Sequence, residues 1–279
     1  MEYIKLTIKG FIMGIANIIP GVSGGTIALI LGIYEKFIHS INNLFKDLKN
    51  NIKFLLPILI GIVISILTMS NIIDYSYKNF AIATTLFFMG LITGGVPMLY
   101  SKVKNKKKSN LNILIMVLTF SFVIFMAFAN KIFDYQTISF ANTNILSYII
   151  LLIVGMIASA TMIIPGVSGS LVLMLLGYYY PIIELIKNIF NIQNIIILMV
   201  FGIGVLLGII LISKLIEYLF KKHETNTYYG VLGFIYASIF AVAIPVVTNY
   251  SITFNIIEVI IGLILGVLGY ILAYKLGEK

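Results

Sequence analysis

The chain has no cysteine and no arginine, and only 10% of its residues are charged. Without cysteine it has no disulfide framework, no thiolate metal ligand and no cysteine nucleophile. Without arginine it has no guanidinium that could hold a phosphate or carboxylate through two parallel hydrogen bonds. Any bound anion must therefore be held by backbone N–H groups, hydroxyls, amides or lysine.

What the chain has instead is apolar sequence. Hydrophobic residues make up 60% of it, and the mean hydropathy is +1.08. Several stretches of about twenty residues carry no charge, which is typical of transmembrane helices and excludes a soluble domain. The first apolar run has no small-residue cleavage site and belongs to a repeat, so we do not interpret it as a removable signal peptide. The sequence predicts a polytopic α-helical membrane protein.

One unusual motif occurs twice. IIPGVSGGTIALILGIY at Ile18–Tyr34 returns as IIPGVSGSLVLMLLGYY at Ile163–Tyr179. Each copy places a Pro, Gly and Ser cluster inside an apolar run, which is the pattern of a broken membrane helix. We therefore predict two homologous halves, about 1–134 and 135–279. After the motifs, the expected ordinary spans are about 54–72, 80–100 and 111–130, then 194–213, 228–247 and 254–273.

The lysines predict how these segments cross the membrane. If each motif were one discontinuous span, the lysines would divide nine against ten. If each motif is a hairpin that enters and leaves on one side, only Lys78, Lys131 and Lys187 face the other side. The positive-inside rule favours the hairpins, with both termini in the cytoplasm. Each half then crosses an odd number of times, so the second half is inverted relative to the first.

The predicted fold class is therefore an all-α polytopic membrane protein with two inverted-topology repeats. Each repeat is a Pro/Gly-broken, re-entrant helical hairpin plus three transmembrane helices. Hairpin arms of about 15 to 19 residues would reach roughly 22 to 28 Å, against a hydrocarbon core of about 30 Å. Whether the hairpins re-enter or nearly span is left open. In either case the two hairpin tips approach from opposite sides and can meet near the middle of the membrane.

Backbone geometry predicts anion binding at these tips. Pro20 and Pro165 end the incoming helices, and Ser23 and Ser168 can N-cap the outgoing ones. The N–H groups of the first helical turn are unpaired and lie at the positive end of the helix dipole. The expected donors are the N–H groups of Gly24, Gly25, Gly169 and Ser170 and the side chains of Thr26, Ser170 and Asn17. The alternative is a small-residue turn that only lets helices pack closely.

The extended motifs resemble a known family. GIANIIPGVSGGTIALILGIYEKFI at Gly14–Ile38 and ASATMIIPGVSGSLVLMLLGYYYPII at Ala158–Ile183 resemble the PopT-type polyprenyl-phosphate translocases, and the similarity covers the whole chain. The resemblance implies transport of undecaprenyl phosphate from the outer to the inner leaflet of a bacterial cytoplasmic membrane. It also implies a headgroup-binding set consisting of Asn17, Pro20, Gly21, Ser23, Gly24, Gly25, Thr26, Pro165, Gly166, Ser168, Gly169 and Ser170.

The two copies are not identical. Asn17, Gly25 and Glu35 stand where the second copy has Met162, Ser170 and Tyr180. The predicted cradle is therefore asymmetric. Glu35 is either a coupling carboxylate for a proton or an interfacial residue beside its neighbouring lysine. The coupling ion, a proton or sodium, and the oligomeric state remain open. We predict no cofactor, no metal and no nucleic-acid partner, and His39 and His223 have no ligand-spaced partner.

Other polar residues allow plainer interpretations. The lysines between positions 102 and 108 either set topology or attract anionic lipid headgroups. Lys214 and Glu217 are expected to snorkel or to form a pair on the helix surface. Tyr178, Tyr179 and Tyr180 are expected in an aromatic belt.

Three classes of function follow from these observations. The first is a translocase that holds a lipid phosphate between the tips while the tail stays in the bilayer and one half rocks against the other. The second is an ion-coupled transporter or channel for a small anion or solute. The third is an intramembrane enzyme. Against an enzyme, the topology places no His, Asp or Lys beside Ser23 or Ser168 as a base.

Overall fold

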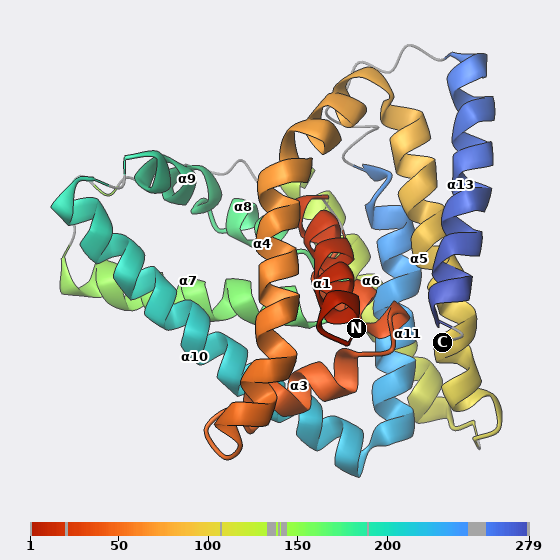
Figure 1. Ribbon diagram of the computed structural model, residues 1–279, viewed down its shortest axis with the longest axis horizontal. Helices are drawn as coiled ribbons and strands as arrows, with labels where there is room; N and C mark the ends of the chain where they lie inside the picture. Colours follow the sequence, from red (N-terminus) through yellow and green to blue (C-terminus); the bar gives the residue numbers. More distant parts are fainter. Residues whose placement is uncertain are drawn as a thin grey trace.

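A computed structural model describes residues 2–19, 22–106, 108–132, 138, 140, 144–188, 190–244 and 255–277, and all the regular structure in them is helical (Figure 1). The first half contains α1 (Glu2–Ile18), α2 (Gly24–Ile30), α3 (Tyr34–Asn42), α4 (Leu48–Asn79), α5 (Ala81–Lys104) and α6 (Asn110–Ile132). The second contains α7 (Ile145–Ile163), α8 (Gly169–Leu175), α9 (Tyr179–Lys187), α10 (Ile192–Lys222), α11 (Glu224–Ala241) and α13 (Ile256–Gly277). The all-α prediction is confirmed.

The first four helices of the two halves correspond in order and in approximate length. α2 and α8 each have seven residues, and α3 and α9 each have nine. The long helices α4 and α10, of 32 and 31 residues, follow them. The predicted boundary between residues 134 and 135 lies outside the described residues. The division into two repeats and their inverted orientation therefore stay predictions.

Six helices are long and apolar enough to cross a membrane: α4, α5, α6, α7, α10 and α13. Five of them match predicted spans, and α7 adds one from the second motif. The expected span at 228–247 is α11, which begins at Glu224 and does not meet the same criteria of length and composition. α11 packs against α5 and α6, and ten of its residues, two of them glycines, are buried. Because its neighbours are protein rather than lipid, it needs less apolar surface.

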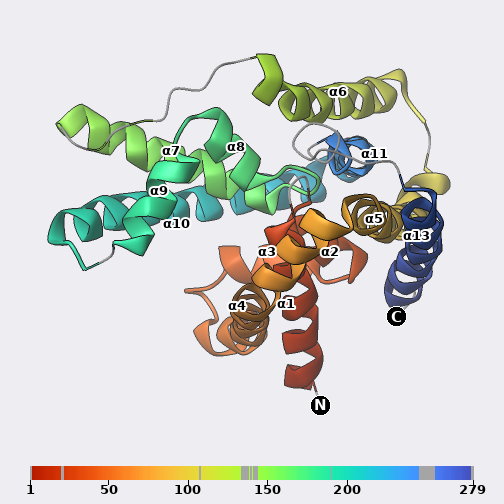
Figure 2. The same cartoon turned by 90° about the horizontal axis from the view of Figure 1, so that it is seen from above.

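Four helices stand side by side in the order α13, α5, α11, α6, which Figure 2 shows from above. Close backbone contact is possible because small residues face each other at the crossings. A Cβ on Gly90 of α5 would overlap the carbonyl of Gly266 in α13. A Cβ on Gly233 of α11 would overlap the carbonyl of Met116 in α6. The row therefore joins helices from both halves.

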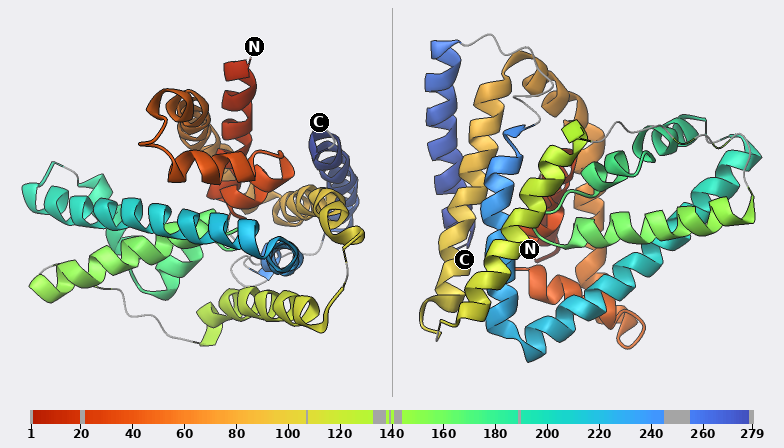
Figure 3. Two further views of the ribbon diagram at one scale, coloured as in Figure 1. Left: turned by 90° about the horizontal axis from the view of Figure 1, so that it is seen from below. Right: turned by 180° about the vertical axis from the view of Figure 1, so that it is seen from behind.

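Two arms pack beside this row. The first is α1 with α4, carrying α2 and α3, and the second is α7 with α10, carrying α8 and α9. In Figure 3 the second arm extends obliquely away from the row. Because α13 packs on α5 and α6 packs on α11, the halves interlock and do not form two separate bodies. The expected rocking of one half against the other stays a prediction.

Candidate functional site

Both motifs break the chain where the sequence predicts. α1 ends at Ile18 and α2 begins at Gly24, and Ser23 Oγ accepts a hydrogen bond from the Thr26 N–H at 3.2 Å. In the second copy, Ser168 Oγ accepts from the Leu171 N–H at 3.5 Å. Both predicted N-caps are thus confirmed. Pro165 lies in the second break, whereas Pro20 and Gly21 lie outside the described residues.

A second break lies near the end of each motif, and it was not predicted. Gly32 and Gly177 have φ values of +66° and +76°, in the left-handed region that glycine adopts without a Cβ penalty. The N–H of Ile33 bonds to the carbonyl of Ala28, which with the Gly32 bond to Leu29 forms a Schellman motif. The chain bends by 108° between α8 and α9. The incoming arms, of 17 and 19 residues, have the expected length, but the outgoing arms are seven-residue helices that turn sharply.

The two tips touch, as the sequence predicts, although 140 residues separate them. The Gly166 N–H donates to Thr26 Oγ1 at 2.7 Å and lies 3.2 Å from Ser23 Oγ. Ser23 Oγ also contacts Thr26 Oγ1 at 3.1 Å and donates to the Ile164 carbonyl at 3.2 Å. Ser23 is 2% exposed and Thr26 is fully buried. The tips therefore form one buried polar junction inside an apolar surround.

At this junction the predicted donors bind one another. The Gly24 N–H donates to Asn17 Oδ1 at 2.8 Å, so Asn17 acts here as an acceptor. A Cβ on Gly25 would overlap the carbonyl of Ile163, so backbone meets backbone between the tips at this residue. In the second tip, Ser168 Oγ and Ser170 Oγ are 2.9 Å apart. An anion can reach these groups only by replacing their present partners.

Tyr34 belongs to the site, although the sequence analysis did not single it out. Its ring is 2% exposed, and its hydroxyl donates to the Ile163 carbonyl of the other tip at 3.2 Å. A signal was present, because the motif ends in tyrosine in both copies, at Tyr34 and Tyr179. Tyr34 thus ties α3 to the break after α7.

Charged residues join α3 to the second half. Glu35 accepts a hydrogen bond from the Tyr228 hydroxyl at 2.5 Å. Glu217 of α10 accepts from Asn42 at 2.6 Å and lies 3.1 Å from His39 Nδ1. These contacts connect α3 to both α10 and α11. Glu35 therefore bridges the predicted repeats, and its role as a coupling or an interfacial carboxylate stays a prediction.

Glu217 forms a pair on the helix surface, but its partner is not Lys214, for which snorkelling stays a prediction. Glu217 instead binds Lys221 of the next helical turn at 2.7 Å. A glutamate four residues before a lysine has the favoured orientation for a helix pair. Of the basic run near position 104, Lys106 pairs with Glu224 at 2.6 Å, and Lys107 lies outside the described residues.

The contacts around α3 and α9 are not equivalent. α3 packs on α10, but in the described helices the corresponding pair, α9 and α4, is not packed together. Tyr180, which stands where the first copy has Glu35, is 65% exposed. In the described helices, α3 is therefore packed against the second half, whereas α9 has no comparable contact with the first half.

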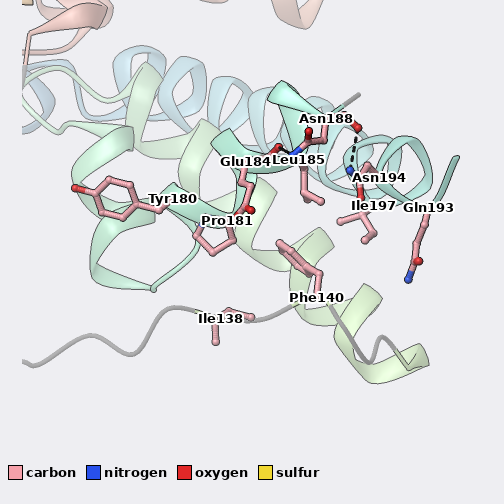
Figure 4. A pocket seen from close by; sticks show the side chains of 10 residues that line it. All are labelled: Ile138, Phe140, Tyr180, Pro181, Glu184, Leu185, Asn188, Gln193, Asn194 and Ile197. Atoms are coloured by element: carbon pink, nitrogen blue, oxygen red, sulfur yellow. Dashed lines mark hydrogen bonds between the residues drawn. The ribbon is translucent and has the colours of Figure 1, made fainter. Parts of the chain in front are cut away.

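Among the cavities near the arms, two are considered as binding sites. One, of about 540 Å³, lies between α9, the start of α10, Ile138 and Phe140, as Figure 4 shows. It contains the Glu184 carboxylate, and its side-chain amides donate to backbone carbonyls, as in the 2.9 Å contact from Asn194 Nδ2 to the Asn188 carbonyl. Among the described lining residues the charged side chain is the Glu184 carboxylate, which disfavours an anion. The other, of about 390 Å³, is an apolar groove between α6, α10 and α11 that ends at Pro165 and Tyr34.

Comparisons with known proteins agree over most of the chain. Residues 13–255 match the family described as undecaprenyl phosphate translocase-like. The chain is 35% identical over 277 residues to a polyprenyl-phosphate transporter of Staphylococcus aureus, covering 97% of this chain and 94% of that protein. It is 32% identical over 242 residues to a polyprenyl-phosphate transporter of Vibrio cholerae, covering 81% and 73%. No solved structure matches the chain significantly.

Proposed function

The chain belongs to the undecaprenyl phosphate translocase-like family, and on this premise we propose that it moves undecaprenyl phosphate across the bacterial cytoplasmic membrane for reuse. Both termini lie in the cytoplasm, and the phosphate is held between the tips of α2 and α8. The relatives that carry the name polyprenyl-phosphate transporter support this substrate. Their name as transporters also supports transport rather than catalysis.

The choice of site rests on one observation, the buried junction between Ser23, Thr26 and Gly166. Crossing the apolar core would cost an unpaired phosphate many kcal/mol, so the protein must supply hydrogen-bond donors there. The hydroxyls and N–H groups that now bond across the junction are donors of that kind. When the arms separate, a phosphate between the tips takes over these bonds, and hydrogen bonds to a charged group are the stronger ones.

The contacts of Ser23 also bear on the enzyme alternative. Its hydroxyl touches a threonine hydroxyl, a backbone carbonyl and a backbone N–H. None of these is a general base that could activate a serine nucleophile. A small-anion transporter would use the same donors, and the binding of lipid and inorganic phosphates distinguishes it from a lipid translocase.

We expect purified protein to bind undecaprenyl phosphate more tightly than undecaprenol or phosphatidylglycerol. The alcohol lacks the charge, and the phosphodiester carries a second substituent where the junction has little room. A hydrogen bond to a charged group contributes about 1.5 to 3 kcal/mol, so losing one weakens binding about tenfold or more. Competition binding in lipid nanodiscs measures this. Equal competition by undecaprenol would refute headgroup recognition, and stronger competition by inorganic phosphate would favour the small-anion transporter.

The inverted topology predicts which ends of α4 and α10 share a side of the membrane. In intact cells, single cysteines from Lys49→Cys and Lys222→Cys should be protected from an impermeant thiol reagent. Cysteines from Asn79→Cys and Gln193→Cys should react. All four residues are exposed, and the natural chain contributes no background thiol. If Gln193→Cys were protected while Lys222→Cys reacted, the repeats would be parallel rather than inverted.

The difference in packing between α3 and α9 distinguishes the two sides of the membrane in this conformation. In the proposed topology α3 lies on the cytoplasmic side and α9 on the outer side. The packed α3 then holds the two halves together on the cytoplasmic side, while the unpacked α9 makes no such contact on the outer side. Alternating access would exchange these two arrangements by moving the arms against the central row.

A further inference from the structure

The apolar groove of about 390 Å³ reaches from the turn between α10 and α11 to the tip junction. Its walls come from α6, α10 and α11 and carry mainly Ile, Leu, Val and Phe side chains. The polar residues His223, Asn226 and Thr227 lie near the turn between α10 and α11, and Tyr34 lines the groove beside the junction. Leu215, on one wall, is 51% exposed, so this wall reaches the outer surface of the helices.

The groove is continuous with the proposed phosphate site. Pro165 lines it, and the next residue, Gly166, donates its N–H to the hydroxyls of the first tip. Tyr34 also lines it and donates its hydroxyl to the Ile163 carbonyl. An apolar chain bonded to a phosphate at the junction would therefore enter the groove directly.

Burial of the junction makes such a space necessary. In a polyprenyl phosphate the headgroup is bonded directly to the first isoprene unit. Ser23 is 2% exposed and Thr26 is 0% exposed, so a phosphate that replaces their present partners lies inside the protein rather than at its lipid-facing surface. A tail that stays wholly in the bilayer, as the sequence analysis expects, could not be joined to a phosphate at this depth.

We propose that the groove between α6, α10 and α11 holds the isoprene units next to the phosphate, while the rest of the tail leaves past Leu215 into the bilayer. This inference rests on the proposed function. Moving an apolar chain from lipid to protein brings little hydrophobic gain, because both surroundings are apolar. The groove therefore acts by packing around a chain of fitting shape, and it distinguishes isoprenoid phosphates by the units nearest the headgroup.

Gly230 allows a direct test. It lines the groove, and a Cβ there would lie 3.3 Å from a methyl of Ile115 on the opposite wall. Gly230→Leu should fill the space and leave the tip residues unchanged. The matched control is Gly202→Leu in α10, because a Cβ at Gly202 has nothing within 4 Å. Thermal unfolding of both variants checks that they fold.

The measurement is binding of dimethylallyl phosphate, farnesyl phosphate and undecaprenyl phosphate in nanodiscs. In the wild type and in Gly202→Leu, affinity should rise with the added isoprene units. In Gly230→Leu, dimethylallyl phosphate should bind as in the wild type, and the longer phosphates should bind about tenfold more weakly, a difference of about 1.4 kcal/mol. If the affinity of Gly230→Leu depended on chain length as in the wild type, the proposal that the groove holds the tail would be wrong. A wild type that does not prefer the phosphates over their alcohols would overturn the proposed function instead.

A second readout does not depend on filling the groove. The chain has no tryptophan, so Leu219→Trp places a unique fluorophore in the groove wall. A farnesyl phosphate brominated near its headgroup should quench it more strongly than brominated phosphatidylglycerol. Leu263→Trp on the exposed face of α13 is the control and should show no such preference. Stronger quenching by phosphatidylglycerol at position 219 would identify an ordinary phospholipid as the occupant and overturn the proposal.

Discussion

Replacing Gly25 with alanine should reduce transport by one to two orders of magnitude. The added Cβ would overlap the backbone carbonyl of Ile163, which belongs to the opposite tip and cannot move as a side chain can. Overpacking of this kind costs about 1 to 3 kcal/mol. Since 1.4 kcal/mol corresponds to a factor of about ten, the junction should lose most of its closed population. The measurement is uptake of undecaprenyl phosphate headgroups in proteoliposomes.

The matched control for this variant is Gly202→Ala. Gly202 is also a helical glycine, but a Cβ there has open space around it. The control should transport normally and gain up to about 1 kcal/mol of stability, because alanine favours the helix. Normal transport by Gly25→Ala, with protein levels equal to those of the control, would show that the tip junction is not the transport site.

Cross-linking α3 to α10 should stop transport, and cleaving the cross-link should restore it. His39 Nδ1 and Glu217 Oε1 are 3.1 Å apart, so His39→Cys with Glu217→Cys can be bridged by a short, reducible bifunctional thiol reagent. The absence of natural cysteine makes the reaction specific. If the contact between α3 and α10 must open to release the headgroup into the cytoplasm, a fixed contact holds one conformation. Transport should then fall to background and return after reduction.

Two comparisons make this result interpretable. The unbridged double variant gives the baseline, since it lacks both side chains but keeps its freedom to open. The pair Asp74→Cys with Lys78→Cys lies within α4 and is as close, with 2.6 Å between the natural charged atoms. A bridge within one helix should leave transport unchanged. Full activity of the bridged α3–α10 pair would show that this contact does not open during the cycle.

Several features of the site could be predicted because they are local. Ser23 and Ser168 cap their helices because a serine after a proline break can accept a hydrogen bond from the next turn. The breaks after them were missed because the apolar pattern runs through Gly32 and Gly177 without interruption. Only the conformation of these glycines, with positive φ, shows that the helix stops there. The pattern of apolar residues along the sequence does not indicate such a turn.

The relation between the halves was predicted only in outline. Repetition of the motif showed that two similar tips exist, and opposed tips were expected to meet. It did not show that α13 packs on α5 and α6 on α11, because small residues at a helix crossing resemble those at any other crossing. The pairing of Glu35 with Tyr228 was also hidden, since the two residues are 193 positions apart.

The sequence by itself determined that this is a helical membrane protein with two broken, N-capped motifs. The reason is that backbone groups in lipid must be satisfied within the helix, so apolar runs and their interruptions have few alternatives. Tertiary structure alone decided that the two tips satisfy each other's donors, that α3 is packed while α9 is not, and that an apolar groove ends at the junction. These features depend on which distant surfaces of the protein meet. The sequence around a serine or a glycine is the same whether the residue contacts water, lipid or the opposite tip.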